Sequence, residues 1–281
     1  MSIDYKITQD NIMIKTYIRQ HLEISAKAMT KLKTSGIFLN GEHAFVTRMM
    51  KKGDVLTLVP EISNKTKYEM EDIPIDILYE DENYLILDKA PFMTVYPAGK
   101  YMTGSLLNAV AFHRKNMVFR PIYRLDRNTS GIIVIAKNKI ASVSEIHKTY
   151  LAVCEGICEE KGVIDSKIQL EKGSRIKRTV GEGKFARTDF ERISHSETHS
   201  LLKIVIHTGR THQIRVHFAS LGFALAGDDL YGGKTDKINR QALHCHKICI
   251  KNKALGFNKE IISQARSDIR ENFADLFKVE G

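Results

Sequence analysis

Four branched apolar residues, IIVI at 132–135, follow directly on the polar segment 123–131, YRLDRNTSG. Such a run is typical of a strand buried in the core, and Asp, Asn, Thr, Ser and Gly before it are the residues of a tight turn. The segment also places Asp126 between Arg124 and Arg127, which a turn does not require. The pattern predicts a turn into a buried strand and leaves open whether the acid has a chemical role.

Segments with strand and helix patterns follow one another irregularly over the rest of the chain. Strands are expected at 84–91, 131–138, 149–156 and 199–206, and helices at 104–115, 142–148, 212–222 and 263–281. Because strands and helices do not alternate regularly, a doubly wound parallel sheet is not expected. The sequence instead predicts an α+β fold with a mixed, largely antiparallel sheet flanked by helices.

A compact basic block at the N-terminus precedes a polar, proline-containing stretch without apolar periodicity. The block is expected to contain helices at 11–21 and 26–35, an Asn-Gly turn at 40–41 and a strand at 53–59. Ser25 would cap the second helix and Gly36 would end it. The expected organisation is an N-terminal module at 1–62, a linker at 63–72 and a larger domain at 73–281.

The balance of charge favours a polyanionic partner. The 281 residues include 43 Lys and Arg against 33 Asp and Glu, a formal net charge of +10. Nucleic acid is the first expectation and an anionic membrane surface the second. In the basic block we expect a phosphate-binding surface, although a merely solvated face has the same pattern. Its members would be Lys27, Lys31, Arg48, Lys51 and Lys52.

No apolar stretch approaches the length of a membrane span, and residues 1–20 are too polar for a signal peptide, so a cytoplasmic protein is expected.

The four cysteines form two pairs spaced by four residues, Cys154 with Cys158 and Cys245 with Cys249. In a strand such residues lie roughly 13 Å apart, too far to share one tetrahedral zinc. We therefore expect free, buried thiols and no metal site.

Four segments carry a family pattern, in this order along the chain: YRLDRNTSG at 123–131, KTYLAVCEG at 148–156, HTGRTHQIRVH at 207–217 and GDDLYGG at 227–233. With these segments the chain resembles the pseudouridine synthases of the RluA type, over about residues 74–250. The N-terminal block resembles the small S-four-like RNA-binding module, in ISAKAMTKLKTSGIFLNG and GDVLTL. That module is a common partner of this catalytic domain.

The resemblance implies an isomerase that converts uridine to pseudouridine in structured RNA without a cofactor or metal. It implies that Asp126 is the catalytic nucleophile and that Arg210 is the cation that keeps it ionised. Tyr150 would stack on the base and act as an acid or base. Arg124 would fill the place that the extruded uridine leaves in the RNA. Ribosomal RNA is expected ahead of transfer RNA, and the protein is expected to be a monomer.

Two positions depart from the family pattern: Tyr123 stands where the family usually has His, and Asn128 where it often has an acid. Neither is the nucleophile, so they bear on contacts with the substrate. One alternative is a non-catalytic RNA-binding protein that keeps the synthase fold. Another is an aspartic protease, but that chemistry needs two carboxylates in one site, and the sequence has no second copy of the segment.

Overall fold

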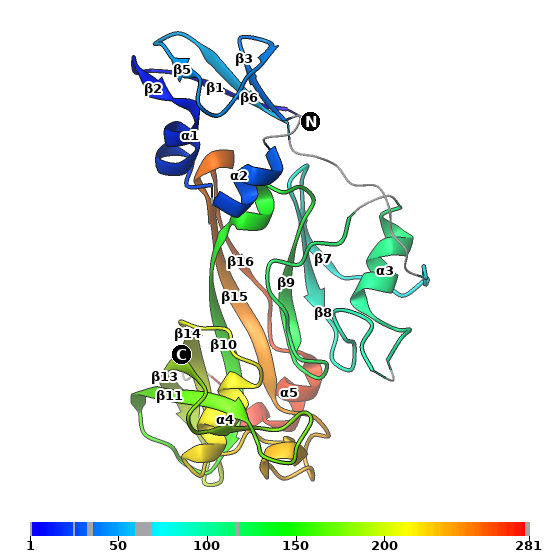
Figure 1. Cartoon of the computed structure of the whole chain (residues 1–281). Coiled ribbons are helices and arrows are strands. Elements are labelled where there is room, and N and C mark those ends of the chain that lie inside the picture. The colour runs from blue at the N-terminus through cyan, green and yellow to red at the C-terminus, as the bar shows by residue number, and fades with distance from the viewer. Residues whose placement is uncertain are drawn as a thin grey trace.

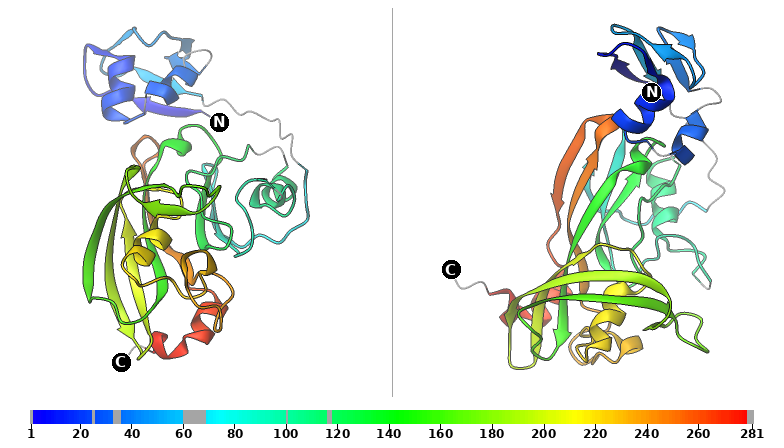
Figure 2. Two further views of the ribbon diagram at one scale, coloured as in Figure 1. Left: turned by 60° about the horizontal axis from the view of Figure 1, so that its bottom comes forward. Right: turned by 60° about the vertical axis from the view of Figure 1, so that its left-hand side comes forward.

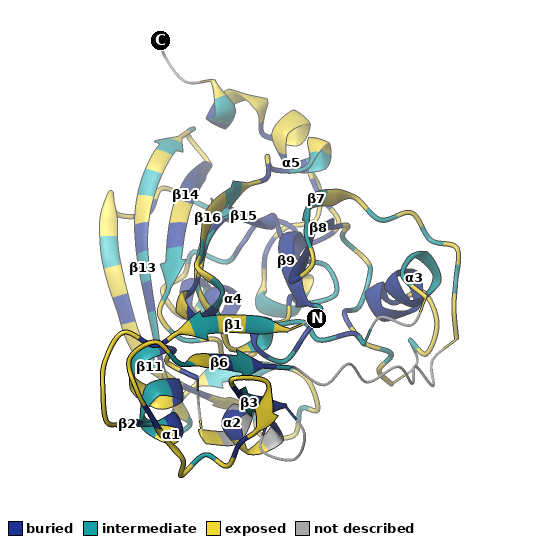
Figure 3. Ribbon diagram, turned by 90° about the horizontal axis from the view of Figure 1, so that it is seen from above, coloured by how far each residue is buried: buried dark blue, intermediate teal, exposed yellow. Residues whose placement is uncertain are grey.

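The apolar run at the centre of the sequence forms strand β9 (Ser130–Ala136), whose seven residues are all buried. The computed structural model describes residues 2–24, 26–32, 36–59, 69–99, 101–115 and 118–278. Viewed from above, β9 is enclosed by neighbouring strands (Figure 3). Before it, the amide of Thr129 donates to the carbonyl of Asp126 at 3.2 Å, so residues 126–129 form the expected turn.

The described residues form a ten-stranded sheet in the order β12-β11-β13-β14-β10-β15-β9-β8-β7, with β16 paired to β15. The pair of β9 and β15 is parallel and the others are antiparallel, which confirms the predicted mixed, largely antiparallel sheet. The remaining strands are β7 (Ile77–Glu80), β8 (Tyr84–Lys89), β10 (Glu145–Glu155), β11 (Lys161–Leu170), β12 (Arg178–Val180), β13 (Lys184–His195), β14 (His199–Ile206), β15 (Leu243–Asn252) and β16 (Phe257–Ile262).

Helices flank this sheet and close its ends (Figure 1). The α-helices are α3 (Leu106–His113), α4 (Gln213–Ser220) and α5 (Ser267–Asn272), and the 3₁₀ turns are η2 (Ala141–Val143), η3 (Asp229–Tyr231), η4 (Lys253–Leu255) and η5 (Ala274–Phe277). Ser105 begins α3 with a capping box that it shares with Asn108. The helices expected at 104–115 and 212–222 are therefore confirmed.

The glycine of the RLDRNTSG segment is required by the approach of β9 to β15. Gly131 has φ 111°, and a β-carbon there would overlap the backbone of Cys245. Any other residue would be strained in this conformation and would push the two strands apart.

Three sequence expectations were wrong in detail. The helix expected at 142–148 is a short 3₁₀ turn, and β10 begins at Glu145 because residues 145–152 pair with β15. The C-terminal helix is limited to α5 and η5. Cys158 does not continue the strand of Cys154, because the chain turns at Gly156, where φ is 76°.

The N-terminal block has its own four-stranded sheet in the order β1-β6-β3-β4, and a pair of strands β2 and β5. These strands are β1 (Ile3–Lys6), β2 (Ile12–Met13), β3 (Ile37–Leu39), β4 (Glu42–His43), β5 (Met49–Met50) and β6 (Val55–Leu58). The expected turn at Asn40 and Gly41 is confirmed by φ angles of 53° and 85°. The expected first helix starts later, as α1 (Ile14–Thr16) continued by the π-helix η1 (Tyr17–His21).

The second expected helix is α2 (Ala26–Leu32). Ser25 and residues 33–35 lie outside the described residues, as does 60–68, which holds most of the expected linker.

The N-terminal block contacts the main body beside the end of β15. Its apolar core includes Ile140 and Ala254 from the main body. The hydroxyl of Tyr5 donates to the carbonyl of Ala254 at 2.7 Å, and Lys253 pairs with Glu23 at 3.0 Å. The block thus lies at the opposite end of β10 and β15 from α4 (Figures 1 and 2). None of the helices described has the length and apolar character of a membrane span.

Candidate active site

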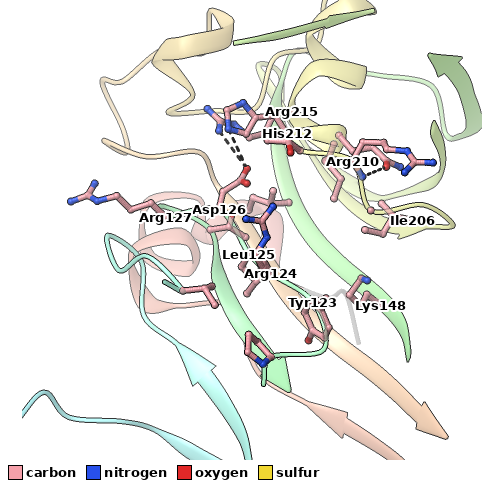
Figure 4. A pocket seen from close by; sticks show the side chains of 18 of the residues that line it. Tyr123, Arg124, Leu125, Asp126, Arg127, Lys148, Ile206, Arg210, His212 and Arg215 are labelled. Carbon is pink, nitrogen blue, oxygen red and sulfur yellow. Dashed lines mark hydrogen bonds and ion pairs between the residues drawn. The ribbon is translucent and has the colours of Figure 1, made fainter. Parts of the chain in front are cut away.

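A cavity of about 620 Å³ opens beside the turn that precedes β9. Its walls come from the loop after β8, from residues 121–129, from β10 and from the turn that leads into α4. The side chains in the wall include Tyr96, Tyr123, Arg124, Asp126, Lys148, Tyr150, Arg210, His212 and Arg215. The structure therefore brings together three of the four segments that carry the family pattern (Figure 4).

Asp126 projects into this cavity toward two basic side chains of the α4 region (Figure 4). Its Oδ2 lies 3.5 Å from Nη1 of Arg215 and 3.9 Å from Nε2 of His212. The Asp126 side chain remains 28% exposed, whereas that of Arg215 is only 8% exposed. The carboxylate is therefore held by a buried cation and still open to a ligand in the cavity.

Arg215 is itself fixed by the fourth segment of the family pattern. Its Nε and Nη2 each bond to one carboxylate oxygen of Asp228, both at 2.7 Å, and its guanidinium lies 4.9 Å from the centre of the Tyr231 ring. Burial is the largest single effect and opposes its charge, but the bonds to Asp228 and the charges of Asp228 and Asp126 together raise the pKa of Arg215. This bidentate geometry leaves Nη1 directed at Asp126.

His212 completes a chain of hydrogen bonds that begins at the edge of the sheet. The amide of Arg178 donates to the hydroxyl oxygen of Tyr231 at 2.8 Å, and that hydroxyl lies 2.9 Å from Nδ1 of His212. Burial lowers the pKa of His212, and the carboxylate of Asp126 partly opposes this effect. When the Tyr231 hydroxyl donates to Nδ1 of the neutral ring, the proton of His212 lies on Nε2, toward Asp126.

Arg210 does not occupy the position expected for it. Its Nε donates to the carbonyl of Phe185 at 2.9 Å and its amide to the side chain of Gln213 at 3.0 Å. Arg210 belongs to the exposed turn before α4, whereas Arg215 lies within the buried first part of that helix. The cation against Asp126 is therefore Arg215, and the expected pairing with Arg210 is corrected.

A β-bulge aims Tyr150 at the same cavity. The pairing of β10 with β15 shifts between Thr149 and Tyr150, so that Tyr150 faces Cys245. Bulges redirect side chains in this way and are frequent beside active sites. Tyr150 is buried, and this burial raises its pKa well above the ordinary value. Its phenol is therefore protonated near neutral pH and can donate a hydrogen bond.

The remaining expected residues divide between the rim and the floor of the cavity. Arg124 is exposed and lines the cavity. Tyr123 donates its hydroxyl proton to the carbonyl of Ile132 at 2.7 Å, and the ammonium of Lys148 lies 4.6 Å from its ring centre. Asn128, the other departure from the family pattern, accepts from Nη1 of Arg127 at 2.9 Å.

Two buried cations bond to backbone carbonyls directly after Asp126, and neither was singled out from the sequence. The ammonium of Lys89 donates to the carbonyl of Arg127 at 3.2 Å. Arg240, paired with Asp268, donates to the carbonyl of Asn128 at 3.2 Å. Burial, followed by the charge of Arg240, lowers the pKa of Lys89 to about 7. The role of Lys89 and Arg240 in anchoring the backbone becomes visible only in the structure, where both side chains are buried.

The basic residues of the N-terminal block are distant in sequence from the residues that line this cavity. Arg48, Lys51 and Lys52 are exposed, and Arg48 lies 3.7 Å from Glu42. The side chains of Lys27 and Lys31 lie outside the described residues.

The four cysteines are free thiols, three of them buried and Cys249 partly exposed. Cys154 and Cys158 contact each other, because the turn after β10 brings them together, so their expected separation was wrong. Within the described ranges, no three His, Cys, Asp or Glu side chains are grouped so as to hold a metal ion.

Comparisons with known proteins show which family the chain belongs to. The family described as RNA pseudouridylate synthase matches residues 83–220. An uncharacterized RNA pseudouridine synthase of Bacillus subtilis, YjbO, is 37% identical over 252 residues, which cover 84% of this chain and 89% of that protein. Ribosomal large subunit pseudouridine synthase D of Xanthomonas campestris is 32% identical and covers 77% of this chain and 74% of its own.

A solved structure, human RNA pseudouridylate synthase domain containing 1, superposes with a TM-score of 0.59 and 25% identity. It covers 68% of this chain and 83% of the human chain. The chain therefore belongs to the RNA pseudouridine synthases, in the RluA-type family, and these enzymes are isomerases that act on RNA. Asp126 is the sole carboxylate among the described residues of the cavity wall, which removes the aspartic protease alternative.

Proposed function

We propose that Asp126 is the catalytic nucleophile of uridine isomerisation and that Arg215 pairs with its carboxylate. The observation that carries this proposal is the contact of a partly exposed carboxylate with a buried guanidinium, which is itself fixed by Asp228. A nearby opposite charge favours the ionised carboxylate. An RNA-binding protein without activity has no need of such a pair, so the arrangement disfavours the non-catalytic alternative.

In the reaction, the bond between ribose C1′ and uracil N1 breaks, the base turns, and a bond from C1′ to C5 forms. N1 gains a proton and C5 loses one, so no redox step is involved. The carboxylate of Asp126 would assist the first cleavage, either by a transient covalent bond or by stabilising the positive charge that develops. Tyr150, as a protonated phenol, would stack on the base and donate a hydrogen bond. The exposed Arg124 would occupy the gap left by the extruded uridine.

The substrate that the comparisons favour is ribosomal RNA of the large subunit, ahead of transfer RNA. The supporting observation is the name of several relatives, ribosomal large subunit pseudouridine synthase D, among them proteins of Xanthomonas campestris and Vibrio vulnificus. A ribosomal substrate would also place the enzyme in the cytoplasm. That the enzyme acts as a monomer stays a prediction.

The N-terminal block, residues 1–62, would be an S-four-like RNA-binding module joined through a linker at 63–72 to a catalytic domain at 73–281. Its separate sheet supports this division. The exposed Arg48, Lys51 and Lys52 support phosphate binding, because basic groups without buried partners are free to contact RNA.

The experiment that tests the proposal compares wild type with Asp126→Asn on transcripts of large-subunit ribosomal RNA and transfer RNA. The substitution keeps the size of the side chain and removes its charge, so pseudouridine formation should vanish while RNA affinity changes little. Asp236→Asn, at an exposed carboxylate outside the cavity wall, is the matched control and should retain activity. Turnover by Asp126→Asn within tenfold of wild type would exclude Asp126 as the nucleophile.

A further inference from the structure

Arg127, the second arginine beside Asp126, takes no part in the ion pairs of the cavity. Its guanidinium lies over the ring of Tyr101, 4.4 Å from the ring centre, and 5.7 Å from the ring centre of Phe92. Figure 4 shows its side chain pointing away from Asp126. Its Nε is buried without a hydrogen-bond partner among the described residues. A positive charge is therefore held in the cavity wall by the two rings and by the bond from Nη1 to Oδ1 of Asn128.

Phe92 has an unusual backbone conformation for a bulky residue. Its φ is 63°, in the left-handed region that favours glycine, and its side chain is 43% exposed. A bulky residue in this region is an outlier, and such strain is concentrated at functional sites. An exposed ring gains little from packing in the fold, so packing of the core does not explain a phenylalanine at this position.

A single buried ammonium connects Phe92 with Arg127. Lys89 donates to the carbonyls of Ala90 at 2.7 Å and Met93 at 3.0 Å, on either side of Phe92, and to the carbonyl of Arg127 at 3.2 Å. These three bonds fix the turn that carries Phe92 against the backbone of Arg127. The exposed ring and the guanidinium are therefore held in one arrangement beside the nucleophile.

We propose that Phe92 and Arg127 form a platform for the nucleotide next to the target uridine, and this rests on the proposed function of Asp126. The ring of Phe92 stacks on the unstacked neighbouring base, and the guanidinium of Arg127 binds a phosphate of the same stretch of backbone. Exposed aromatic rings beside basic groups are the usual receptors of single-stranded RNA. An apolar protein partner would gain nothing from the charge of Arg127, so RNA is the occupant that fits both groups.

The test separates stability from binding at Phe92. Phe92→Gly removes the ring and relieves the backbone, so its melting temperature should equal or exceed that of wild type, while the dissociation constant for RNA rises about tenfold. Phe92→Tyr keeps a ring and should restore the affinity. Ile262→Ala, at an apolar residue that is 54% exposed and outside the cavity wall, is the control for loss of exposed apolar surface.

Changes in the RNA identify which nucleotide occupies the platform of Phe92 and Arg127. The probe is a ribosomal or transfer RNA transcript in which the wild-type protein forms pseudouridine, with single abasic sites placed on each side of the target uridine. At one neighbouring position, the abasic site should weaken binding to wild type about tenfold and leave binding to Phe92→Gly unchanged. Arg127→Gln should reduce the salt slope by about 0.7, as expected for one lost phosphate contact.

A lower melting temperature for Phe92→Gly, or an unchanged affinity, would overturn the platform. Abasic sites that affect both proteins equally at every position would also overturn it. These results are independent of the nucleophile, because Asp126→Asn tests the chemistry with RNA binding retained, and Phe92→Gly tests binding with Asp126 intact.

Discussion

The cavity around Asp126 and the basic N-terminal block use charge in opposite ways. In the cavity, Arg215 is buried and each of its polar groups has a specific partner, Asp228 or Asp126. In the N-terminal block, Arg48, Lys51 and Lys52 are exposed to solvent. Buried pairs are costly to break, because the remaining charge loses its compensation, whereas exposed charges act weakly and are screened by salt.

The difference predicts which measured quantity should change when residues of each region are substituted. Substitutions in the cavity should alter the rate of the chemical step, strongly and without additivity. Substitutions in the N-terminal block should alter RNA affinity, in small steps that depend on salt. The predictions below are ordered from the largest expected effect to the smallest.

Arg215→Met should lower the single-turnover rate at saturating RNA by about 10² to 10³, which is typical of losing one preorganised charge in an active site. It also leaves Asp228 buried and unpaired, so the melting temperature should fall. Rates should therefore be measured at a temperature where circular dichroism shows that the variant is folded.

The matched substitution Arg210→Met should leave the rate within about threefold, because the side chain of Arg210 bonds to the carbonyl of Phe185 rather than to Asp126. Equal losses of rate in both variants would mean that Arg210 moves against Asp126 when RNA binds, and the assignment of Arg215 would need revision.

Tyr231→Phe should lower the single-turnover rate about tenfold. The ring and its contact with Arg215 remain, but the hydroxyl between the amide of Arg178 and Nδ1 of His212 is lost. His212 then loses its hydrogen bond to this hydroxyl, and a lost hydrogen bond to a buried group costs about 1–3 kcal/mol. His212→Gln should give a similar loss, and the double variant should be little worse than either. Fully additive losses would show that the two residues act separately.

Removal of residues 1–62 should weaken RNA binding and flatten its salt dependence, while turnover at saturating RNA persists. The cut exposes Ile140 and Ala254, now buried against the N-terminal block, so some loss of stability is expected. The measurement is an RNA titration of both proteins over a salt series, with rates at saturation. A folded but inactive truncation would show that the block helps to build the active site.

The triple variant Arg48→Gln, Lys51→Gln, Lys52→Gln should have the smallest effect per residue. If all three contact phosphates, the slope of log affinity against log salt should fall by about two, at about 0.7 per contact on single strands. An unchanged slope would identify this face as solvated surface only.

Local patterns allowed much of the fold to be predicted, because short-range chemistry decides turns and buried strands. The turn before β9, the Asn-Gly turn at 40–41 and the cap of α3 are of this kind. The segment 142–148 was misread as a helix because pairing between distant strands decides its structure.

The site was predicted in part. Asp126 and Tyr150 line one cavity as expected, but the exchange of Arg210 for Arg215 was not foreseen. The early residues of α4 are all buried, so no amphipathic pattern marks the direction of Arg215. Its partner Asp228 becomes apparent only when the chain is folded, and the same holds for Lys89.

The most direct test of the contrast is the single-turnover rate of pseudouridine formation at saturating RNA, measured together with the dissociation constant. The two proteins are Asp126→Asn and the triple variant of Arg48, Lys51 and Lys52. We expect Asp126→Asn to have no detectable rate and nearly wild-type affinity. We expect the triple variant to have the wild-type rate and a weaker affinity that is lost faster with salt. A measurable rate in Asp126→Asn within tenfold of wild type would contradict the assignment of the chemistry to this carboxylate.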